Sequence, residues 1–456
     1  MIGADSGDTR GQGPGSRGGV LAPGTVPPLT STPAAGGTDV ALSPRSDAPE
    51  QRPDVAAPPR SAARPTPALW ELVDARALLA GVRWTLSTTA VAASSFFLGL
   101  VAIWAAAWMT HHSVAQTAVQ WDGTWYYFIS QHGYVHALPT AANQYNALRA
   151  AFFPGLPFVE RVVHDIVGGS PARTTLLVGA AGLVVSCLLL RALVTRMFGD
   201  EVAWRSVVVF AFFPGAYVFL LGYSEALEIP LAILVLYALR RRWYLVAGVA
   251  TALATGTRIT GLALVAACIV GAVREVLAQR GATVWTRQTV FRLVTALAAP
   301  IIGLAGLVGY MVFLHQRTGS YLAFNTAERV GWNNSLDFAE PFRAMQAFAD
   351  HPFSIPYQTM NALGTVAILA CLVLLGVDGL RRLRLEETIY AAVILLAWMF
   401  TSNTGAWFRF AEAAFPVLIL LALRLGQRWY PVVACAGASI FGILLLFFLT
   451  NTAFSP

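Results

Sequence analysis

The chain has 456 residues, of which 56% are hydrophobic and only 12% are charged, and its mean hydropathy is +0.59. A chain this apolar is not an ordinary soluble globule, and we expect a polytopic membrane protein. The formal net charge is +7, and the chain contains arginine but no lysine. Most arginines beyond the N-terminal tail stand at the ends of apolar segments, where they orient helices, so nucleic acid is not an expected partner.

The first 69 residues differ in composition from the rest of the chain. They are rich in Pro, Gly, Ala and Ser and contain no aromatic residue. Such a segment cannot bury enough apolar surface to offset the entropy of ordering it. We therefore expect residues 1–69 to be a disordered cytoplasmic tail without a signal peptide. Residues 70–456 are expected to form a transmembrane domain, entered through a short amphipathic helix between Ala68 and Arg83.

Apolar segments separated by arginine clusters make up the rest of the chain. A helix needs about 20 apolar residues to cross about 30 Å of hydrocarbon, and arginines accumulate on the cytoplasmic side. Arg76 and Arg83 therefore place the start of the first span inside. Alternation of sides then predicts an all-α fold with about 11 spans, the N-terminus inside and the C-terminus outside. The expected spans are residues 86–108, 174–195, 203–221, 226–239, the two arms of 243–273, 293–314, 357–377, 388–402, 410–423 and 430–450.

The stretch 243–273 is bounded by arginine clusters at both ends, so we expect a hairpin with its tip at the outer surface. Its only polar break runs from Thr255 to Gly261, and Arg258 lies within that break. An arginine held at the outer face opposes the positive-inside tendency. Arg258 is therefore a functional candidate.

The same assignment of sides places the other unusual polar residues outside. Two long outer loops are expected, at residues 109–172 and 315–356, and the first is expected to carry interfacial helices. Asp122 lies in the first loop among aromatic rings, and Arg409 lies in the last outer turn. The other candidates are predicted to line a substrate groove: Trp121, Trp125, Tyr126, Tyr223, Glu225, Glu328 and Trp332.

One loop carboxylate, outer-face arginines and a groove bathed by lipid suit glycosyl transfer from a polyprenyl-phosphate sugar. The leaving group is a phosphate, which is a stable anion at neutral pH, so one base suffices, whereas a glycoside hydrolase needs two carboxylates. Asp122 is the candidate for the base that takes the proton from the acceptor hydroxyl. Arg258 and Arg409 are the candidates for binding the donor phosphate.

Four segments carry a family resemblance. Residues 121–134, WDGTWYYFISQHGY, resemble the WDxxxYxxIAxxGY signature of PIG-V-type mannosyltransferases, members of the GT-C superfamily of integral membrane glycosyltransferases. Three further segments are similar, in the same order, to that family's FFPxxP, YSExLF and AtxtRxxG motifs. They are residues 151–157 (AFFPGLP), 222–227 (GYSEAL) and 254–261 (ATGTRITG).

The resemblance covers residues 86–425 and implies a GT-C fold, a polyprenyl-phosphate-mannose donor, and inversion at the anomeric carbon. It also implies that the acid of the first loop, here Asp122, is the base, and that mannose passes to an extracytoplasmic lipid glycan or protein at the plasma membrane. Two departures concern the acceptor. Glu228 stands where the family usually has Phe, and the second long loop lacks an evident counterpart of the eukaryotic sequence. The eukaryotic acceptor, a glycosylphosphatidylinositol precursor, is therefore not carried over.

Several assignments have alternatives. Glu225 stands at the start of a span, where the helix dipole favours a carboxylate, and Arg409 could extend to the outer headgroups. The enzyme could use another polyprenyl-phosphate sugar such as a pentose. The chain could also be a lipid flippase, a transporter or a non-catalytic scaffold subunit. No cofactor is firmly predicted. A divalent metal at Asp122 stays an open alternative without support in the sequence, because the loop histidines lack metal-ligand spacing. Membrane lipids are expected partners in every case.

Overall fold

The computed structural model describes residues 75–138, 147–280, 285–332, 336–352, 356–401 and 404–450. Within these ranges the regular elements are helices, and no strand is present. The predicted all-α fold is therefore confirmed. The expected tail at residues 1–69 lies outside the described residues, as do Ser402 and Asn403 of the last outer turn.

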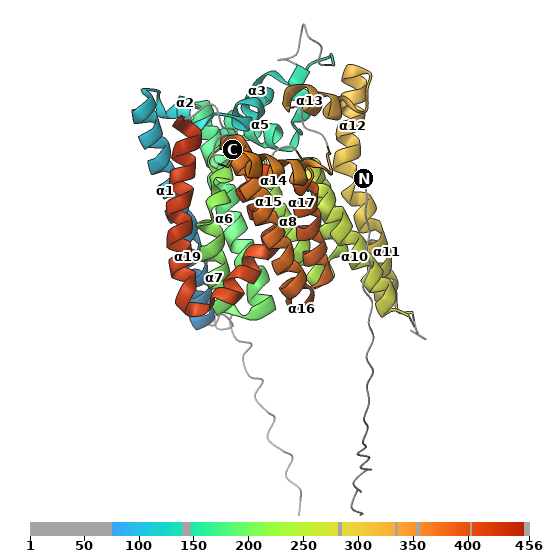
Figure 1. Ribbon diagram of the computed structural model, residues 1–456. Helices are drawn as coiled ribbons and strands as arrows, with labels where there is room; N and C mark the ends of the chain where they lie inside the picture. Colours follow the sequence, from blue (N-terminus) through green and yellow to red (C-terminus); the bar gives the residue numbers. More distant parts are fainter. Residues whose placement is uncertain are drawn as a thin grey trace, which may run out of the picture. The chain divides into compact units, whose positions relative to one another are not determined.

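The first part of the chain forms one long helix and then runs across one end of the bundle. The elements are α1 (Ala75–Thr110), α2 (Val114–Ala118), α3 (Asp122–His132), the 3₁₀ helix η1 (Leu148–Ala151) and α5 (Gly155–Val167). In Figure 1, α2, α3 and α5 lie at the upper end of the long helices, here called the loop end. The described part of the expected helix between Ala68 and Arg83 is helical, and it is continuous with the first span in α1.

Three helices and a 3₁₀ turn follow: α6 (Pro171–Phe198), α7 (Asp200–Ala211), η2 (Pro214–Phe219) and α8 (Glu225–Arg241). α6 begins where the Ser170 side chain accepts a hydrogen bond from the backbone N–H of Arg173, with Pro171 at the first helical position. α7 ends shortly before Pro214, because the residue preceding a proline disfavours helical geometry. The expected span at 203–221 is therefore a helix followed by a 3₁₀ turn.

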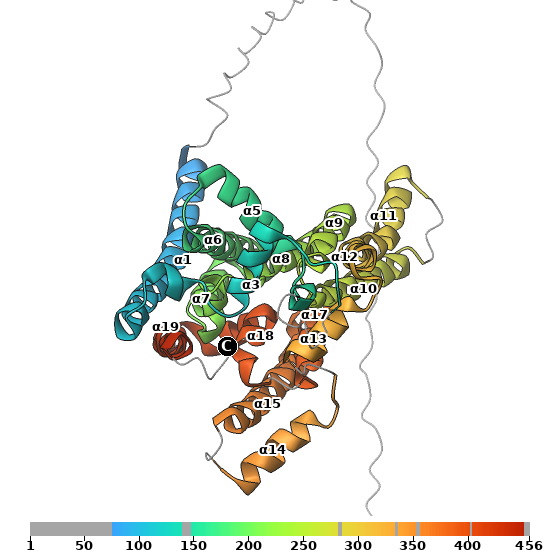
Figure 2. The ribbon, with the colours of Figure 1, turned by 90° about the horizontal axis from the view of Figure 1, so that it is seen from above.

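The predicted hairpin is present as two helices with a break between them. α9 (Tyr244–Thr255) and α10 (Leu262–Ala278) are its arms, and η3 (Ile259–Gly261) lies in the break. α11 (Arg287–Gly303) and α12 (Ala305–Thr318) come next. Pro300 lies inside α11, and the two helices separate at Leu304. Figure 2 shows α9 to α12 together on one side of the bundle.

The last part of the chain returns to the loop end and then completes the bundle. Its first helices are α13 (Ala323–Trp332) and α14 (Glu340–Asp350). The others are α15 (Pro356–Leu374), the π-helical turn η4 (Leu375–Gly379), α16 (Leu380–Arg382), α17 (Leu385–Met399), η5 (Thr404–Ala406), α18 (Trp407–Ala413) and α19 (Pro416–Thr450). α19 contains a kink at Gly426, where φ is +59°.

Six helical stretches among the described residues are long and apolar enough to cross a membrane. They are Leu79–Thr110, Pro171–Phe198, Ile259–Ala278, Arg287–Thr318, Gln358–Arg382 and Pro416–Thr450. The multi-pass character of the chain agrees with the prediction. The count of about 11 spans is not confirmed, because the other expected spans coincide with shorter helices such as α7, α8, α9 and α17.

Ion pairs connect α8 and α10 to α17 at the end of the bundle away from the loop end. Arg240 of α8 pairs with Glu387 of α17, and Nη2 of Arg274 on α10 lies 2.7 Å from Oε1 of Glu386. Both glutamates are buried, so each has a cation that offsets its loss of hydration. These pairs hold α8 and α10 against α17.

Candidate active site

Asp122 is the first residue of α3, and glycine packing brings α3 close to the turn before α8. A Cβ atom on Gly123 would lie 2.1 Å from the carbonyl oxygen of Leu221, so a larger residue would not fit without a shift of the backbone. Gly222, in the same turn, has φ of +69°, which favours glycine. The close approach of these two segments sets the position of Asp122 relative to Glu225.

Trp121, the residue before Asp122, has an unusual backbone conformation for a residue with a side chain. Its φ is +55° and its ψ is −132°. Its indole N–H donates a hydrogen bond to the carbonyl of Phe448 on α19 at 3.2 Å. Strained conformations persist where the surroundings hold them, and they cluster at functional sites. The indole contact therefore anchors the start of α3 to the last helix.

Asp122 belongs to a network of ion pairs between distant parts of the chain. Nη2 of Arg409, on α18, lies 3.1 Å from Oδ2 of Asp122. The same guanidinium donates to both carboxylate oxygens of Glu225, the first residue of α8. Glu225 also pairs with Arg258, whose Nη1 lies 2.7 Å from its Oε1. Four of the residues predicted from the sequence are thus brought together.

The burial of these side chains decides two of the alternatives. The Arg409 side chain is only 8% exposed and turns inward to two carboxylates, which excludes the alternative that it extends to the outer headgroups. Glu225 does occupy the first turn of α8, where the helix dipole favours it. It is also fully buried between two guanidiniums, so its contacts extend beyond the helix end.

Sequence reasoning did not select Glu228 as a site residue, yet it joins the same network. Its Oε2 lies 3.8 Å from Nε of Arg258, and its Oε1 accepts a hydrogen bond from the hydroxyl of Thr260. The sequence signal that could have identified Glu228 is its spacing of three residues from Glu225, because residues three apart on a helix lie on the same side. The network contains three carboxylates and two guanidiniums, so it carries no net positive charge when all are ionised.

Two tyrosines predicted from the sequence lie against these charges. The guanidinium carbon of Arg409 lies 4.2 Å from the ring centroid of Tyr223. Tyr126 is buried on α3; burial raises the pKa of its phenol, Arg258 lowers it, and Asp122 raises it. Because the net shift is upward, Tyr126 stays neutral and is not a base at neutral pH. Asp122 remains the candidate base.

The elbow before α5 contacts the turn that carries Arg258. The backbone N–H of Gly155 donates to the carbonyl of Gly256 at 3.0 Å. A Cβ atom on Gly155 would lie 2.4 Å from Oγ1 of Thr257, so glycine is needed at this contact. The second and fourth motif segments therefore pack directly against each other.

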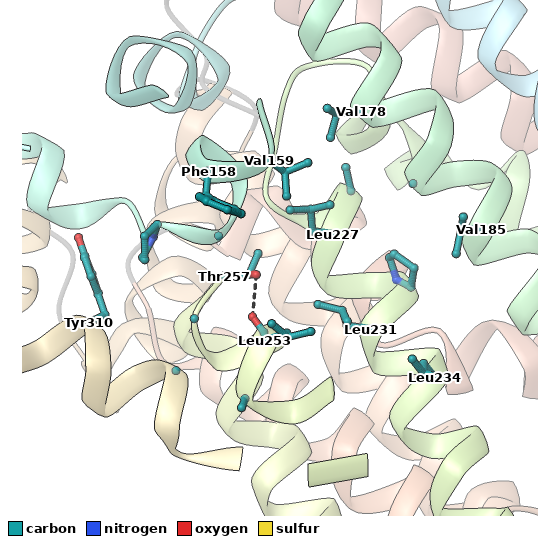
Figure 3. Close-up of a pocket in the computed structure, with 18 of the residues that line it drawn as sticks. Phe158, Val159, Val178, Val185, Leu227, Leu231, Leu234, Leu253, Thr257 and Tyr310 are labelled. Carbon is teal, nitrogen blue, oxygen red and sulfur yellow. Dashed lines mark hydrogen bonds between the residues drawn. The ribbon is translucent and has the colours of Figure 1, made fainter. Parts of the chain in front are cut away.

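An apolar groove of about 970 Å³ lies beside the network. Its walls come from α6, α8, α9 and α12, and Figure 3 shows Phe158 of α5 above Leu227 and Thr257. Further along α8 the groove is lined by Leu231 and Leu234. A lining this rich in aliphatic side chains suits a hydrocarbon chain better than a sugar.

The first turn of α8 separates the groove from the ion pairs. Ala226 and Leu227 line the groove, whereas Glu225 and Glu228 pair with Arg258 on the other face of the helix. The turn after α9 also separates the groove from the ion pairs. Thr257 lines the groove, and the neighbouring Arg258 belongs to the network.

The remaining predicted residues lie on α3 and α13. Trp125, one turn after Asp122, stacks on Phe152 with ring centroids 5.7 Å apart. Trp332 meets Trp125 and Phe152 edge-on, at 6.3 and 5.5 Å. Glu328 interacts electrostatically with Tyr310, which lines the groove. These rings form an aromatic surface near the start of the groove.

Within the described ranges, no three His, Cys, Asp or Glu side chains are placed to share one metal ion. Asp122, Glu225 and Glu228 are instead oriented toward guanidiniums.

Comparison with known proteins gives similarity to solved structures only. No protein-family model and no curated protein matches the sequence. The chain is similar to ArnT from Cupriavidus metallidurans bound to undecaprenyl phosphate, with 16% identity and a TM-score of 0.46; the match covers 82% of this chain and 66% of that one. It is also similar to the Archaeoglobus fulgidus oligosaccharyltransferase in the apo form, with 13% identity, a TM-score of 0.42, and coverage of 81% and 56%. The chain thus spans between about half and two thirds of the length of these proteins.

Proposed function

We propose that the protein is a GT-C membrane glycosyltransferase that transfers mannose from polyprenyl-phosphate-mannose to an extracytoplasmic lipid glycan or protein, with inversion. The observation that carries the proposal is the meeting of Asp122, Glu225, Arg258 and Arg409 in one network beside an apolar groove. Three of these residues come from the motif segments on which the family resemblance rests, which supports a common role for them.

Asp122 acts as the base in this proposal. It removes the proton from the acceptor hydroxyl as that oxygen attacks the anomeric carbon from the side opposite the phosphate. The bond between the anomeric carbon and the phosphate oxygen breaks, and its electron pair leaves with the phosphate. Oδ2 of Asp122 accepts from Arg409, while no described residue donates to Oδ1, which is therefore available for the proton. The Asp122 side chain is 25% exposed, which supports access by an acceptor.

Arg409 and Arg258 have two roles in the proposal. Arg409 orients Asp122 through its ion pair, and Glu225 in turn holds both guanidiniums in place. The remaining N–H groups of the two arginines bind the donor phosphate, where a low dielectric strengthens charge-assisted hydrogen bonds. The prenyl chain lies in the groove, so its phosphate reaches the network around the first turn of α8.

The sides of the membrane are part of the same proposal. The loop end faces the outside of the plasma membrane, and the N-terminus lies in the cytoplasm, because the arginine clusters alternate in that sense. A polyprenyl-phosphate donor suits this side.

The test uses the purified full chain in lipid nanodiscs with polyprenyl-phosphate-mannose. A membrane extract from a strain lacking the gene supplies the acceptor, and mass spectrometry detects the gain of a hexose. Hexose transfer supports the proposal. Transfer only from a pentose-bearing donor would assign another sugar, and lipid transfer between leaflets without glycosyl transfer would assign a flippase. The absence of all three would point to a scaffold subunit.

A further inference from the structure

A second apolar groove, of about 360 Å³, lies between α10 and α11, which run side by side in both Figure 1 and Figure 2. One wall is a stripe of α10 at helical spacing, and Leu297 and Pro300 of α11 form the other. The stripe consists of Ile269, Ala272, Val273, Val276 and Leu277, and Arg280 completes the lining from the turn after Ala278, the last residue of α10. Spacings of three, four, seven and eight residues place the five aliphatic side chains on one face of the helix.

The stripe faces away from the protein core. Ile269, Val273 and Leu277 are each about half exposed. Exposed aliphatic side chains on a membrane-spanning helix contact lipid tails. The lining contains one charged residue, Arg280, and it lies at the end of the stripe away from the loop end.

Arg280 differs in its pairing from three other arginines at this end of the bundle. Arg240, Arg242 and Arg274 each pair with a carboxylate of α10 or α17. Among the described residues, no carboxylate forms an ion pair with Arg280, and the residue is exposed. Its positive charge is therefore available to an anion that enters along the groove.

The length of the stripe matches one leaflet. From Ile269 to Ala278, where α10 ends, the helix advances about 14 Å at about 1.5 Å per residue, and Arg280 lies in the turn that follows. Half of a hydrocarbon core of about 30 Å is about 15 Å. A lipid whose phosphate meets Arg280 would therefore extend its acyl chain along the stripe and end near the centre of the bilayer.

We propose that the groove between α10 and α11 binds an anionic phospholipid, with its phosphate at Arg280 and an acyl chain along the stripe from Ile269 to Leu277. Basic pockets between helices on the cytoplasmic side are suited to anionic headgroups. The guanidinium of Arg280 binds phosphate oxygens through charge-assisted hydrogen bonds, and the aliphatic stripe contacts the chain. The site lies at the opposite end of α10 from Arg258, so it is independent of the proposed transferase site.

The test is native mass spectrometry of the full chain released from vesicles of phosphatidylglycerol and phosphatidylcholine. The wild type is expected to retain one phosphatidylglycerol, and Arg280→Gln to lose about tenfold in retention, as expected for one charge-assisted hydrogen bond. Val273→Trp, which fills the groove without changing charge, should reduce retention as well. Arg428→Gln is the matched control, because Arg428 lies over the Trp429 ring and is outside this lining.

Two results would overturn the proposal. One is equal retention of phosphatidylglycerol by the wild type and Arg280→Gln. The other is an equal loss in Arg280→Gln and Arg428→Gln, which would indicate non-specific attraction to the surface. Circular dichroism of each variant confirms that the helices are intact, and Val273→Trp tests the groove separately should Arg280→Gln fold poorly.

Discussion

Nη2 of Arg409 lies 3.1 Å from Oδ2 of Asp122, although the two residues are 287 positions apart in the chain. This pair connects the first residue of α3 to α18 at the loop end of the bundle. It also orients the one carboxylate that the proposed transfer reaction uses as a base. The pair therefore links the fold to the proposed chemistry.

Arg258→Lys should impair donor binding although it keeps the charge. Arg258 pairs with Glu225 and donates to Ser224 through the same nitrogen, and its planar fork leaves other N–H groups for a phosphate. A lysine is a point charge that cannot meet these groups at once. We expect the KM for the donor to rise about 10-fold or more, which corresponds to one charge-assisted hydrogen bond. Arg274→Lys, at the ion pair with Glu386, is the control. An unchanged KM in Arg258→Lys would contradict this role for Arg258 and assign phosphate binding to Arg409.

Gly123→Ala should lower both stability and turnover. Its Cβ would lie 2.1 Å from the carbonyl oxygen of Leu221, so α3 must move and carry Asp122 with it. Overpacking of this kind destabilises proteins by about 1–3 kcal/mol. Gly442→Ala is the matched control, because nothing lies within 4 Å of a Cβ there. The measurements are the unfolding temperature and the turnover of both variants. Equal changes in Gly123→Ala and Gly442→Ala would contradict the packing argument.

Glu160→Gln should change how stability depends on pH. Glu160, on α5, is buried, and burial raises the pKa of its carboxyl to about 8, while a hydrogen bond from Thr175 lowers it. The folded protein therefore holds a proton that the unfolded chain releases near its ordinary pKa of 4.5. The resulting stabilisation is complete below that pH, and it is lost at about 1.4 kcal/mol per pH unit as the pH rises toward 8.

The measurement is the unfolding temperature of wild type and variant from about pH 5, just above the ordinary pKa, to about pH 9, above the raised pKa of about 8. The wild type should lose stability relative to Glu160→Gln as the pH rises. Glu201→Gln serves as the control, since the Glu201 side chain is largely exposed. Parallel pH curves for wild type and Glu160→Gln would show that Glu160 is not held neutral.

The sequence predicted local features of the fold well. Arginine clusters and Pro171 mark helix boundaries, and the polar break around Arg258 was placed between two helices, where the structure has it. These features depend on backbone geometry and capping within a few residues, which a single sequence contains. The end of α7 before Pro214 was missed, because the expected span 203–221 continued through that proline. The break between α11 and α12 was missed, because the apolar pattern continues through Pro300.

The site was predicted only as a list of residues. Asp122, Glu225, Arg258 and Arg409 were expected on one face, but their pairing depends on packing between helices distant in the chain. Glu228 was noted only as a departure from the family pattern, because nothing local connects it to Arg258. A substrate groove was expected, but none of the seven residues predicted to line it lines the large apolar groove, whose walls come from helices distant in the chain.

The most direct test of the account is the rate of mannose transfer from polyprenyl-phosphate-mannose by the wild type and by Asp122→Asn in the same nanodiscs. The amide keeps the shape of the side chain and can still accept from Arg409, but it cannot take a proton. Loss of a general base typically lowers the rate about 10²- to 10⁴-fold. Asp165→Asn, at the exposed pair with Arg161, controls for the substitution itself. We predict that Asp122→Asn folds, binds the donor and transfers at or below a hundredth of the wild-type rate, about the lower bound for a lost base; transfer at close to the wild-type rate would contradict the account.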